Sequence, residues 1–341
     1  WLAIPGFWIP PVDRDGNDGE DYGNGSFDRH WDDEVDMFGL LLPCKGDGWA
    51  VTPWGMYGRV GANSGLYEYM FNRVGHRGGP SRTLSNAFGY NAVDNMYSDV
   101  QNESTNMWMV GTHLELTILD PFIFNIEGIY GQLRPTDLGS MYNTISDSTV
   151  GSQGWFVGAT LDYKLDWGTP GIFGWWSTGD KARSDSDGRL GRLPVFGNDG
   201  GSFQPTSFGT SGNWAIDTDT VITGTGVGTW GAGIKIADVS FIEDLTHVLR
   251  VAYYQGSNDN ELVRKGGYFL QNRSDNLYLT DKDSVYEVNF DHTYKIYENL
   301  TAVLELGWLH LDTDRGTWGR SRNKDESSDA WKAQLLFQYK F

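Results

Sequence analysis

Hydrophobic and polar residues alternate along residues 329–341, the last stretch of the chain. One set of alternate positions is apolar and rich in aromatic residues: Trp331, Ala333, Leu335, Phe337, Tyr339 and Phe341. The other set carries Lys332, Gln334, Gln338 and Lys340. Successive side chains of a strand point to opposite faces. The pattern therefore predicts a strand with one face suited to lipid and one suited to a water-filled lumen, although a soluble sandwich can also end on such a strand.

The same two-residue period recurs through the chain and predicts a series of strands. They cover residues 35–42, 49–61, 107–119, 122–131, 155–165, 171–178, 228–236, 246–256, 285–293, 300–311 and 329–341. Most have a length near the roughly 9–11 residues that a tilted strand needs to cross a bilayer.

The connections between these strands alternate in length. Short connections are expected at 43–48, 120–121, 166–169, 237–245 and 294–299. Long polar loops are expected at 62–106, 132–153, 179–227, 257–283 and 312–328. Short periplasmic turns and long extracellular loops are typical of membrane barrels. We therefore predict one all-β domain over residues 1–341, a transmembrane antiparallel up-and-down β-barrel.

The number of strands leads to a prediction about the start of the barrel. Residues 1–11 are interrupted by prolines and form at best the end of a strand, and residues 13–36 read as an acidic, glycine-rich loop. The strands that follow number eleven, whereas single-chain bacterial barrels have an even number. We therefore expect an odd number of strands before Trp1, and five would complete a sixteen-stranded barrel.

Composition narrows the classes of partner. The chain has 341 residues and a formal net charge of −19, which argues against nucleic acid, because phosphate binding needs a Lys/Arg-rich surface. The sequence has no apolar run of about 18 residues, the length that a membrane-spanning helix needs. Cys44 is the only cysteine, so no disulfide forms within the chain. The 15 tryptophans and 17 tyrosines suit aromatic girdles, and suit a carbohydrate-binding β protein nearly as well.

Three stretches beside the predicted short turns carry a family resemblance. They are Phe241-Ile242-Glu243-Asp244-Leu245-Thr246-His247, Tyr294-Lys295-Ile296-Tyr297-Glu298-Asn299-Leu300 and Val51-Thr52-Pro53-Trp54-Gly55-Met56-Tyr57. They resemble the homotrimeric outer-membrane porins of sulfate-reducing bacteria such as Desulfovibrio, within the general bacterial porins. The resemblance implies a homotrimer of water-filled barrels in the bacterial outer membrane, in contact with lipid and lipopolysaccharide. The terminal Phe341 is similar to the signature that the barrel-assembly machinery reads.

The charged side chains on the polar faces are the candidate functional residues. The pore-lining set is Arg59, Glu115, Glu127, Asp162, Lys164, Lys235, Arg250, Glu287, Asp291, Glu305, Lys332 and Lys340. Opposed acidic and basic side chains would impose a transverse field on passing ions. The simpler interpretation is that these charges hydrate the lumen and pair across strands.

Two loop motifs allow further hypotheses. Arg73, Arg77 and Arg82 could belong to a loop that constricts the lumen, or to an ordinary exposed loop. Asp13, Asp15, Asn17 and Asp18 resemble the start of a calcium loop and could hold Ca²⁺. Asp18 stands at the sixth position, however, where an EF-hand needs Gly, and Asn24 stands at the twelfth, where it needs Glu. Apart from this candidate ion, no cofactor is expected.

No catalytic motif is evident. The sequence contains neither H-E-x-x-H nor a nucleophile elbow, so an enzyme is not expected. The preferred function is passive diffusion of ions and small hydrophilic solutes through a water-filled porin. The alternatives are a channel selective for sugars or anions and a soluble carbohydrate-binding or glycoside-hydrolysing β protein with paired carboxylates.

Overall fold

The computed structural model describes residues 6–9, 35–61, 104–137, 149–181, 189–194, 205–210, 226–261, 279–318 and 327–340. Nearly all of these residues lie in strands. The strands are β1 (Gly6–Ile9), β2 (Val35–Leu41), β3 (Cys44–Gly46), β4 (Trp49–Gly61), β5 (Ser104–Leu116), β6 (Phe122–Asp137), β7 (Thr149–Tyr163), β8 (Thr169–Ser177), β9 (Arg189–Leu190), β10 (Thr229–Ile242), β11 (Leu245–Gly256), β12 (Ser284–Tyr297), β13 (Leu300–Asp312) and β14 (Ser327–Tyr339).

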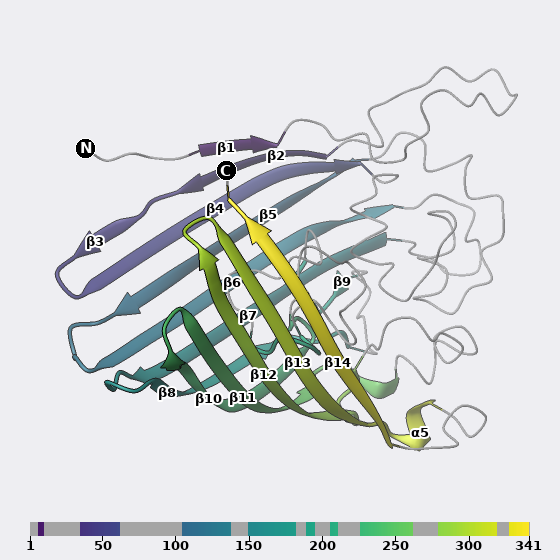
Figure 1. The fold of residues 1–341 in the computed structure, drawn as a ribbon. Coiled ribbons are helices and arrows are strands. Elements are labelled where there is room, and N and C mark those ends of the chain that lie inside the picture. The colour runs from purple at the N-terminus through teal and green to yellow at the C-terminus, as the bar shows by residue number, and fades with distance from the viewer. Residues whose placement is uncertain are drawn as a thin grey trace, which may run out of the picture.

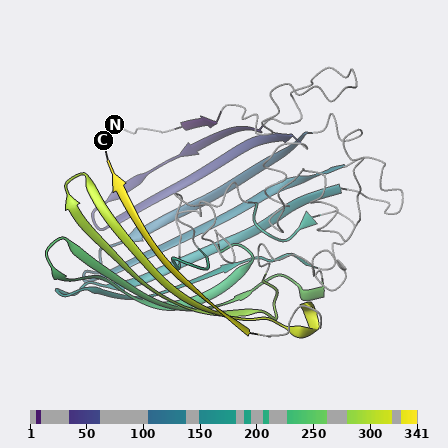
Figure 2. The same ribbon diagram turned by 45° about the vertical axis from the view of Figure 1, so that its right-hand side comes forward.

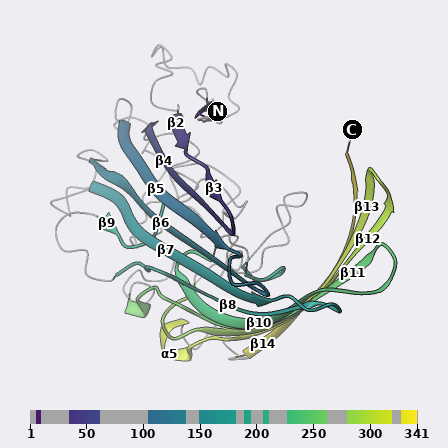
Figure 3. The same cartoon turned by 90° about the vertical axis from the view of Figure 1, so that its left-hand side faces the viewer.

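The strands form one antiparallel up-and-down sheet. Its order is β1-β2-β4-β5-β6-β7-β8-β10-β11-β12-β13-β14, with β3 paired to β4 and β9 running parallel to β7. The sheet curves strongly like the wall of a barrel, with β2 and β14 facing each other across the open side (Figures 1 and 3). The all-β, up-and-down prediction is confirmed, and the eleven predicted strands correspond to the strands of this order from β2 to β14.

The short connections gather at one end of the sheet, as Figure 2 shows. Several are shorter than predicted. The predicted connection 237–245 is strand for most of its length, and only Glu243 and Asp244 separate β10 from β11. Asp238 and Asp244 have positive φ angles of 57° and 62°, a conformation that Asp tolerates better than most residues. The predicted turn 43–48 contains the hairpin strand β3, which leaves Asp47 and Gly48 at its tip.

The strands extend into the predicted long loops at the other end. β6 continues to Asp137 and β7 begins at Thr149, both inside the loop predicted at 132–153. The predicted strands are too short because the alternation of apolar and polar residues stops before the backbone hydrogen bonds between the strands do. The helix α5 (Arg315–Trp318) lies in the last of these connections. Among the described residues, no helix is long and apolar enough to cross a lipid bilayer.

The convex face of the sheet is apolar. Its exposed side chains include Tyr57, Trp155, Val157, Leu161, Tyr163, Trp176, Ile234, Tyr286, Phe290, Trp331, Leu335, Phe337 and Tyr339. The last strand agrees with its predicted pattern, because Trp331 is 78% exposed and Phe337 65% exposed. Exposed apolar side chains on alternate positions of successive strands make a continuous nonpolar surface.

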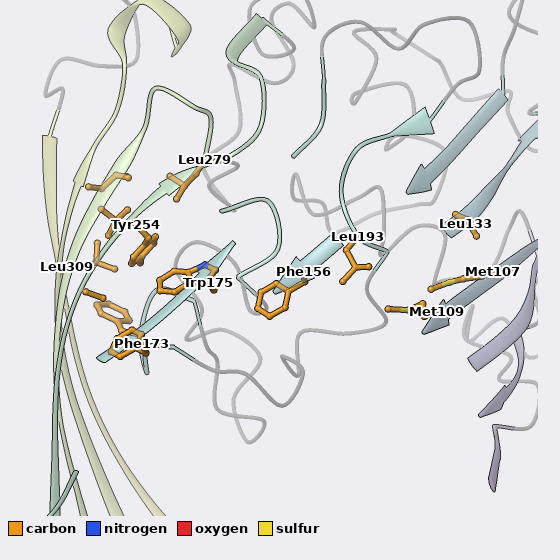
Figure 4. Close-up of a cluster of buried hydrophobic side chains, with 14 residues drawn as sticks. Met107, Met109, Leu133, Phe156, Phe173, Trp175, Leu193, Tyr254, Leu279 and Leu309 are labelled. Atoms are coloured by element: carbon orange, nitrogen blue, oxygen red, sulfur yellow. The ribbon is translucent and has the colours of Figure 1, made fainter. Parts of the chain in front are cut away.

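The buried core lies inside the curve. Figure 4 shows its side chains arranged between the two arms of the sheet, from Leu309 and Tyr254 on one side to Met107 and Met109 on the other. Leu193, Phe208 and Leu279, which lie outside the long strands, join this cluster. The long-loop half of the inner face is therefore covered by other parts of the chain.

Candidate functional site: a charged belt inside the curved sheet

A row of residues in mutual register crosses the inner face from β7 to β14. The row runs Asp162, Gly171, Lys235, Arg250, Asn289, Gly307 and Lys332. Asp291 and Glu305, which face each other on β12 and β13, lie beside it. We use "charged belt" for Asp162, Lys235, Arg250, Asp291, Glu305 and Lys332. The sheet register brings these residues together, from positions up to 170 apart in the sequence.

Opposite charges pair along the belt. Lys235 Nζ lies 3.0 Å from Asp162 Oδ2, and Lys332 Nζ lies 2.6 Å from Glu305 Oε2. Arg250 donates a hydrogen bond to Asp291. All six side chains are at most about one quarter exposed. Charge-assisted hydrogen bonds of this kind are stronger than neutral ones, so the belt is a fixed array of dipoles rather than a set of loose charges.

Gly171 makes the first of these pairs geometrically feasible. It occupies the position on β8 that lies between Asp162 and Lys235. A Cβ atom built on Gly171 would collide with the Asp162 carboxylate. The absence of a side chain therefore lets the two charges meet across an intervening strand.

A segment of the long connection between β8 and β10 packs on the belt. This segment, residues 205–210, is held by the buried carboxylate of Glu287 on β12. The backbone N–H groups of Phe208 and Gly209 each donate to Glu287 Oε1 at 3.1 Å. The Tyr254 hydroxyl donates to Oε2 at 2.8 Å and the Asn289 amide donates to Oε1 at 2.8 Å. A carboxylate with this many donors balances the cost of its own burial.

Ser207 connects the segment directly to the belt. Its hydroxyl donates to Asp291 Oδ1 at 3.0 Å, and its backbone N–H donates to Asn289 Oδ1 at 3.1 Å. Its carbonyl accepts a hydrogen bond from Lys332 Nζ at 2.8 Å. Lys332 therefore contacts both Glu305 and the segment. The segment lies inside the curved sheet at the level of the charged belt.

Phe208 packs at a position where β13 has no side chain. Its ring packs over Gly307 on β13, where an added Cβ would lie 2.9 Å from Phe208 Cδ1. Phe208 is 5% exposed and belongs to the buried cluster. The segment is thus fixed by an apolar contact as well as by hydrogen bonds.

A second network joins the segments at the long-loop end, and we call it the rim network. Asn258 donates through Nδ2 to the carbonyls of Gly228 and Leu279 and accepts from the Asp180 N–H through Oδ1. Arg192 pairs with Asp180 at 2.7 Å. These contacts tie the connection between β8 and β10 to the connection between β11 and β12.

Asp283 is the buried acid of the rim network. Thr280 donates to it through its hydroxyl at 2.6 Å, and the Asp314 N–H and the Trp318 indole donate at 2.8 and 3.0 Å. Burial raises the pKa of the Asp283 carboxyl from its ordinary value, and these hydrogen bonds offset part of that rise. In contrast, the Thr317 hydroxyl holds the pKa of the Asp314 carboxyl below its ordinary value.

Most of the predicted pore-lining residues lie on the inner face. The six residues of the charged belt and Glu287 lie together on the inner face of β7 and of β10 to β14. Glu115 on β5 and Glu127 on β6 also face inward, but on the opposite arm of the sheet. Lys164 and Lys340 lie just beyond β7 and β14 at the short-turn end, where both are exposed.

Arg59 lies on the convex face of the sheet, whereas the sequence predicted that it lines the pore. It lies on β4 with the parity of Tyr57, which is 53% exposed on the convex face, and it stands opposite Asp36 and Asn106. Because this position is at the long-loop end of the strand, the guanidinium can reach water beyond the apolar surface. Arg73, Arg77, Arg82 and the acidic motif at residues 13–18 lie outside the described residues.

The segment at 205–210 is the main functional feature that sequence reasoning missed. The sequence placed it within an undivided loop at 179–227. The available signal was Pro205-Thr206-Ser207-Phe208-Gly209-Thr210, a small polar stretch with one buried aromatic residue. Nothing local to it indicates Glu287, which lies 78 positions from Gly209.

Comparison with known proteins finds similarity in structure only. No family model matches the chain, and no curated protein matches its sequence. The chain is similar to the ferric enterobactin receptor of Pseudomonas aeruginosa, with 9% identity over 91% of this chain and 40% of the receptor and a TM-score of 0.41. It is also similar to the outer-membrane channel DcaP of Acinetobacter baumannii, with 10% identity over 99% and 94% of the two chains and a TM-score of 0.35.

A third similar structure is the trimer form of the Vibrio cholerae outer-membrane protein OmpT, with 10% identity, 89% and 91% coverage and a TM-score of 0.32. The chain spans about two-fifths of the length of the first two matched structures, both siderophore receptors. At these identities and TM-scores, the similarity carries no conclusion about the function of this chain.

Proposed function

We propose that this protein is an outer-membrane channel for passive diffusion of ions and small hydrophilic solutes. The observation that carries the proposal is the opposition of the two faces of the sheet. The convex face is apolar, and the concave face bears the charged belt. A wall with lipid on one side and water on the other requires this arrangement.

The spacing of the aromatic residues supports a membrane span. Tyr130 and Phe122 on β6, Trp155 and Tyr163 on β7, Tyr286 and Tyr294 on β12, and Trp331 and Tyr339 on β14 are each eight positions apart. Eight residues of strand cover about 26 Å. Each pair therefore places one ring near either border of an apolar band, as in the girdles of membrane barrels.

The segment at 205–210 supports a constricted lumen. It narrows the space inside the curve at the level of the belt, and its hydrogen bonds to Glu287, Asp291 and Lys332 hold it in place. Ions pass close to fixed charges of both signs, so the charged belt would set the ion preference.

General diffusion is favoured over a sugar-selective channel. Stacking on sugar rings needs aromatic faces exposed to the lumen. Among the described residues of the inner face, Phe156, Trp175 and Tyr254 are at most 4% exposed, and Trp54 is partly buried. Catalysis forms no part of the proposal. By the family resemblance, we also propose that the protein assembles as a homotrimer.

Conductance measurements test the proposed function. The protein, extracted in detergent and added to planar bilayers, is expected to give discrete openings whose current rises linearly with salt concentration. Sugars and amino acids should permeate in order of size. Saturation by one solute alone would contradict general diffusion, and the absence of any conductance from a protein with heat-modifiable gel migration would contradict a channel. Light scattering of the detergent complex tests the trimer separately.

A further inference from the structure

Two histidines meet on the convex face near the short-turn end of the sheet. His247 on β11 and His292 on β12 stand directly opposite each other in the strand register. Their Nδ1 atoms lie 2.6 Å apart, and the ring planes are at 85°. At this distance, the Nδ1–H group of one imidazole donates a hydrogen bond to the Nδ1 lone pair of the other.

From this geometry, we propose that His247 and His292 form a binding site for a divalent first-row transition-metal ion. Neutral imidazole suits Zn²⁺, Cu²⁺ and Ni²⁺, whereas Mg²⁺ and Ca²⁺ require oxygen ligands. In the right-angle geometry of tetragonal Cu²⁺ or Ni²⁺, metal–nitrogen bonds of about 2.1 Å place the two nitrogens about 3 Å apart. The site therefore needs the nitrogens to separate by only about 0.4 Å, a movement that small side-chain rotations supply.

The surroundings favour a site with open coordination positions. Phe290 lies beside both rings, with centroids 4.2 Å from His292 and 6.0 Å from His247, and Phe241 lies 6.2 Å from His247. These aromatic rings flank the imidazoles. The described residues hold no cluster of three His, Cys, Asp or Glu side chains suited to a metal. Two imidazoles would therefore hold the ion, with water in the remaining positions.

The position of the site gives it a physical consequence. The metal would join β11 to β12 at the level of Tyr294 and Phe290, where the apolar band meets the short turns. A ligand that binds only the folded state stabilises that state. Metal binding would therefore raise the unfolding temperature, and this effect does not depend on whether the lumen conducts.

Nickel titration of the detergent-extracted protein tests the proposal. The expected result is one Ni²⁺ bound per chain, with affinity at least tenfold lower in His247→Ala and in His292→Ala, and no binding of Mg²⁺ at the same concentration. His310→Ala is the matched control: this imidazole lies on the same face near the opposite end and pairs with Asp329 at 2.8 Å. Its removal should leave Ni²⁺ binding unchanged.

Two further measurements keep the test decisive. His247→Gln and His292→Gln retain a polar side chain, so their heat-modifiable migration should match the wild type while their metal-dependent rise in unfolding temperature is lost. The spin-echo modulation of bound Cu²⁺ should report two equivalent imidazoles in the wild type and one in either variant. Ni²⁺ affinity unchanged in His247→Ala and His292→Ala, or a Cu²⁺ spectrum with a single imidazole in the wild type, would overturn the assignment.

Discussion

Lys235 and Asp162 form an ion pair at 3.0 Å although a whole strand, β8, runs between their own strands. Neighbouring strands lie about 4.8 Å apart, so the two backbones are about twice that distance from each other. The pair bridges this gap only because Gly171 leaves the intervening position empty. The relationship shows that register and one missing side chain together build the belt.

Replacing Gly171 with valine is expected to break this pair. The added side chain would occupy the space of the Asp162 carboxylate, and forcing extra volume into a packed site costs about 1–3 kcal/mol. Urea unfolding followed by gel migration should show a lower midpoint. Ile172→Val, which changes the exposed convex face of the same strand, should change the midpoint little. Equal midpoints in the two variants would contradict the role of Gly171.

The Glu287→Gln variant should loosen the segment at 205–210. The glutamine amide group would present N–H groups where donors already point, which leaves at least one buried donor unsatisfied at a cost of about 1–3 kcal/mol. Hydrogen exchange at the amides of Phe208 and Gly209 should accelerate by about tenfold, while Glu115→Gln on the opposite arm leaves their exchange unchanged. Unaltered protection in the first variant would show that Glu287 does not anchor the segment.

Lys332→Met is expected to shift ion preference toward cations. The substitution leaves Glu305 without its 2.6 Å partner and removes one positive charge from the belt. A unit charge about 10 Å from an ion in water changes its energy by about 0.4 kcal/mol, or about twofold in local concentration. The reversal potential across a salt gradient measures this shift. Lys340→Met, at the exposed short-turn end, should give a smaller change.

The Asp283→Asn variant tests the rim network through pH. Because burial raises the pKa of Asp283 in the folded state, its contribution to stability is fully present below the unfolded pKa and is lost as pH rises through the folded pKa. Protection of the Asp281 and Asp314 amides, corrected for intrinsic exchange, should therefore fall as pH rises from about 4. The variant should show lower protection without this slope, because asparagine does not titrate.

Asp312→Asn serves as the control for that experiment. Asp312 ends β13 two positions before Asp314, and its side chain is exposed. The slope with pH should persist in this variant. A slope that survives in Asp283→Asn would mean that another group governs the rim network.

Local sequence pattern determined much of the fold. The alternation in residues 329–341 predicted the exposed face of Trp331 and Phe337, and the same period located the strands from β2 to β14. The reason is that one face of each strand is uniformly apolar, so polarity reports side-chain direction without knowledge of neighbours. Charge alone was less reliable: Arg59 is charged yet shares the face of Tyr57, because polar side chains are tolerated where a strand end passes beyond the apolar band.

The sequence by itself thus determined which side of the wall most residues face, and where the chain turns. Only the tertiary structure decided which residues meet. Asp162 and Lys235, Glu287 and Gly209, and His247 and His292 lie 73, 78 and 45 positions apart, and their encounters depend on strand register and on an inward-packing segment. Register is set by the sum of many backbone hydrogen bonds and cross-strand contacts, so no single residue announces its partner.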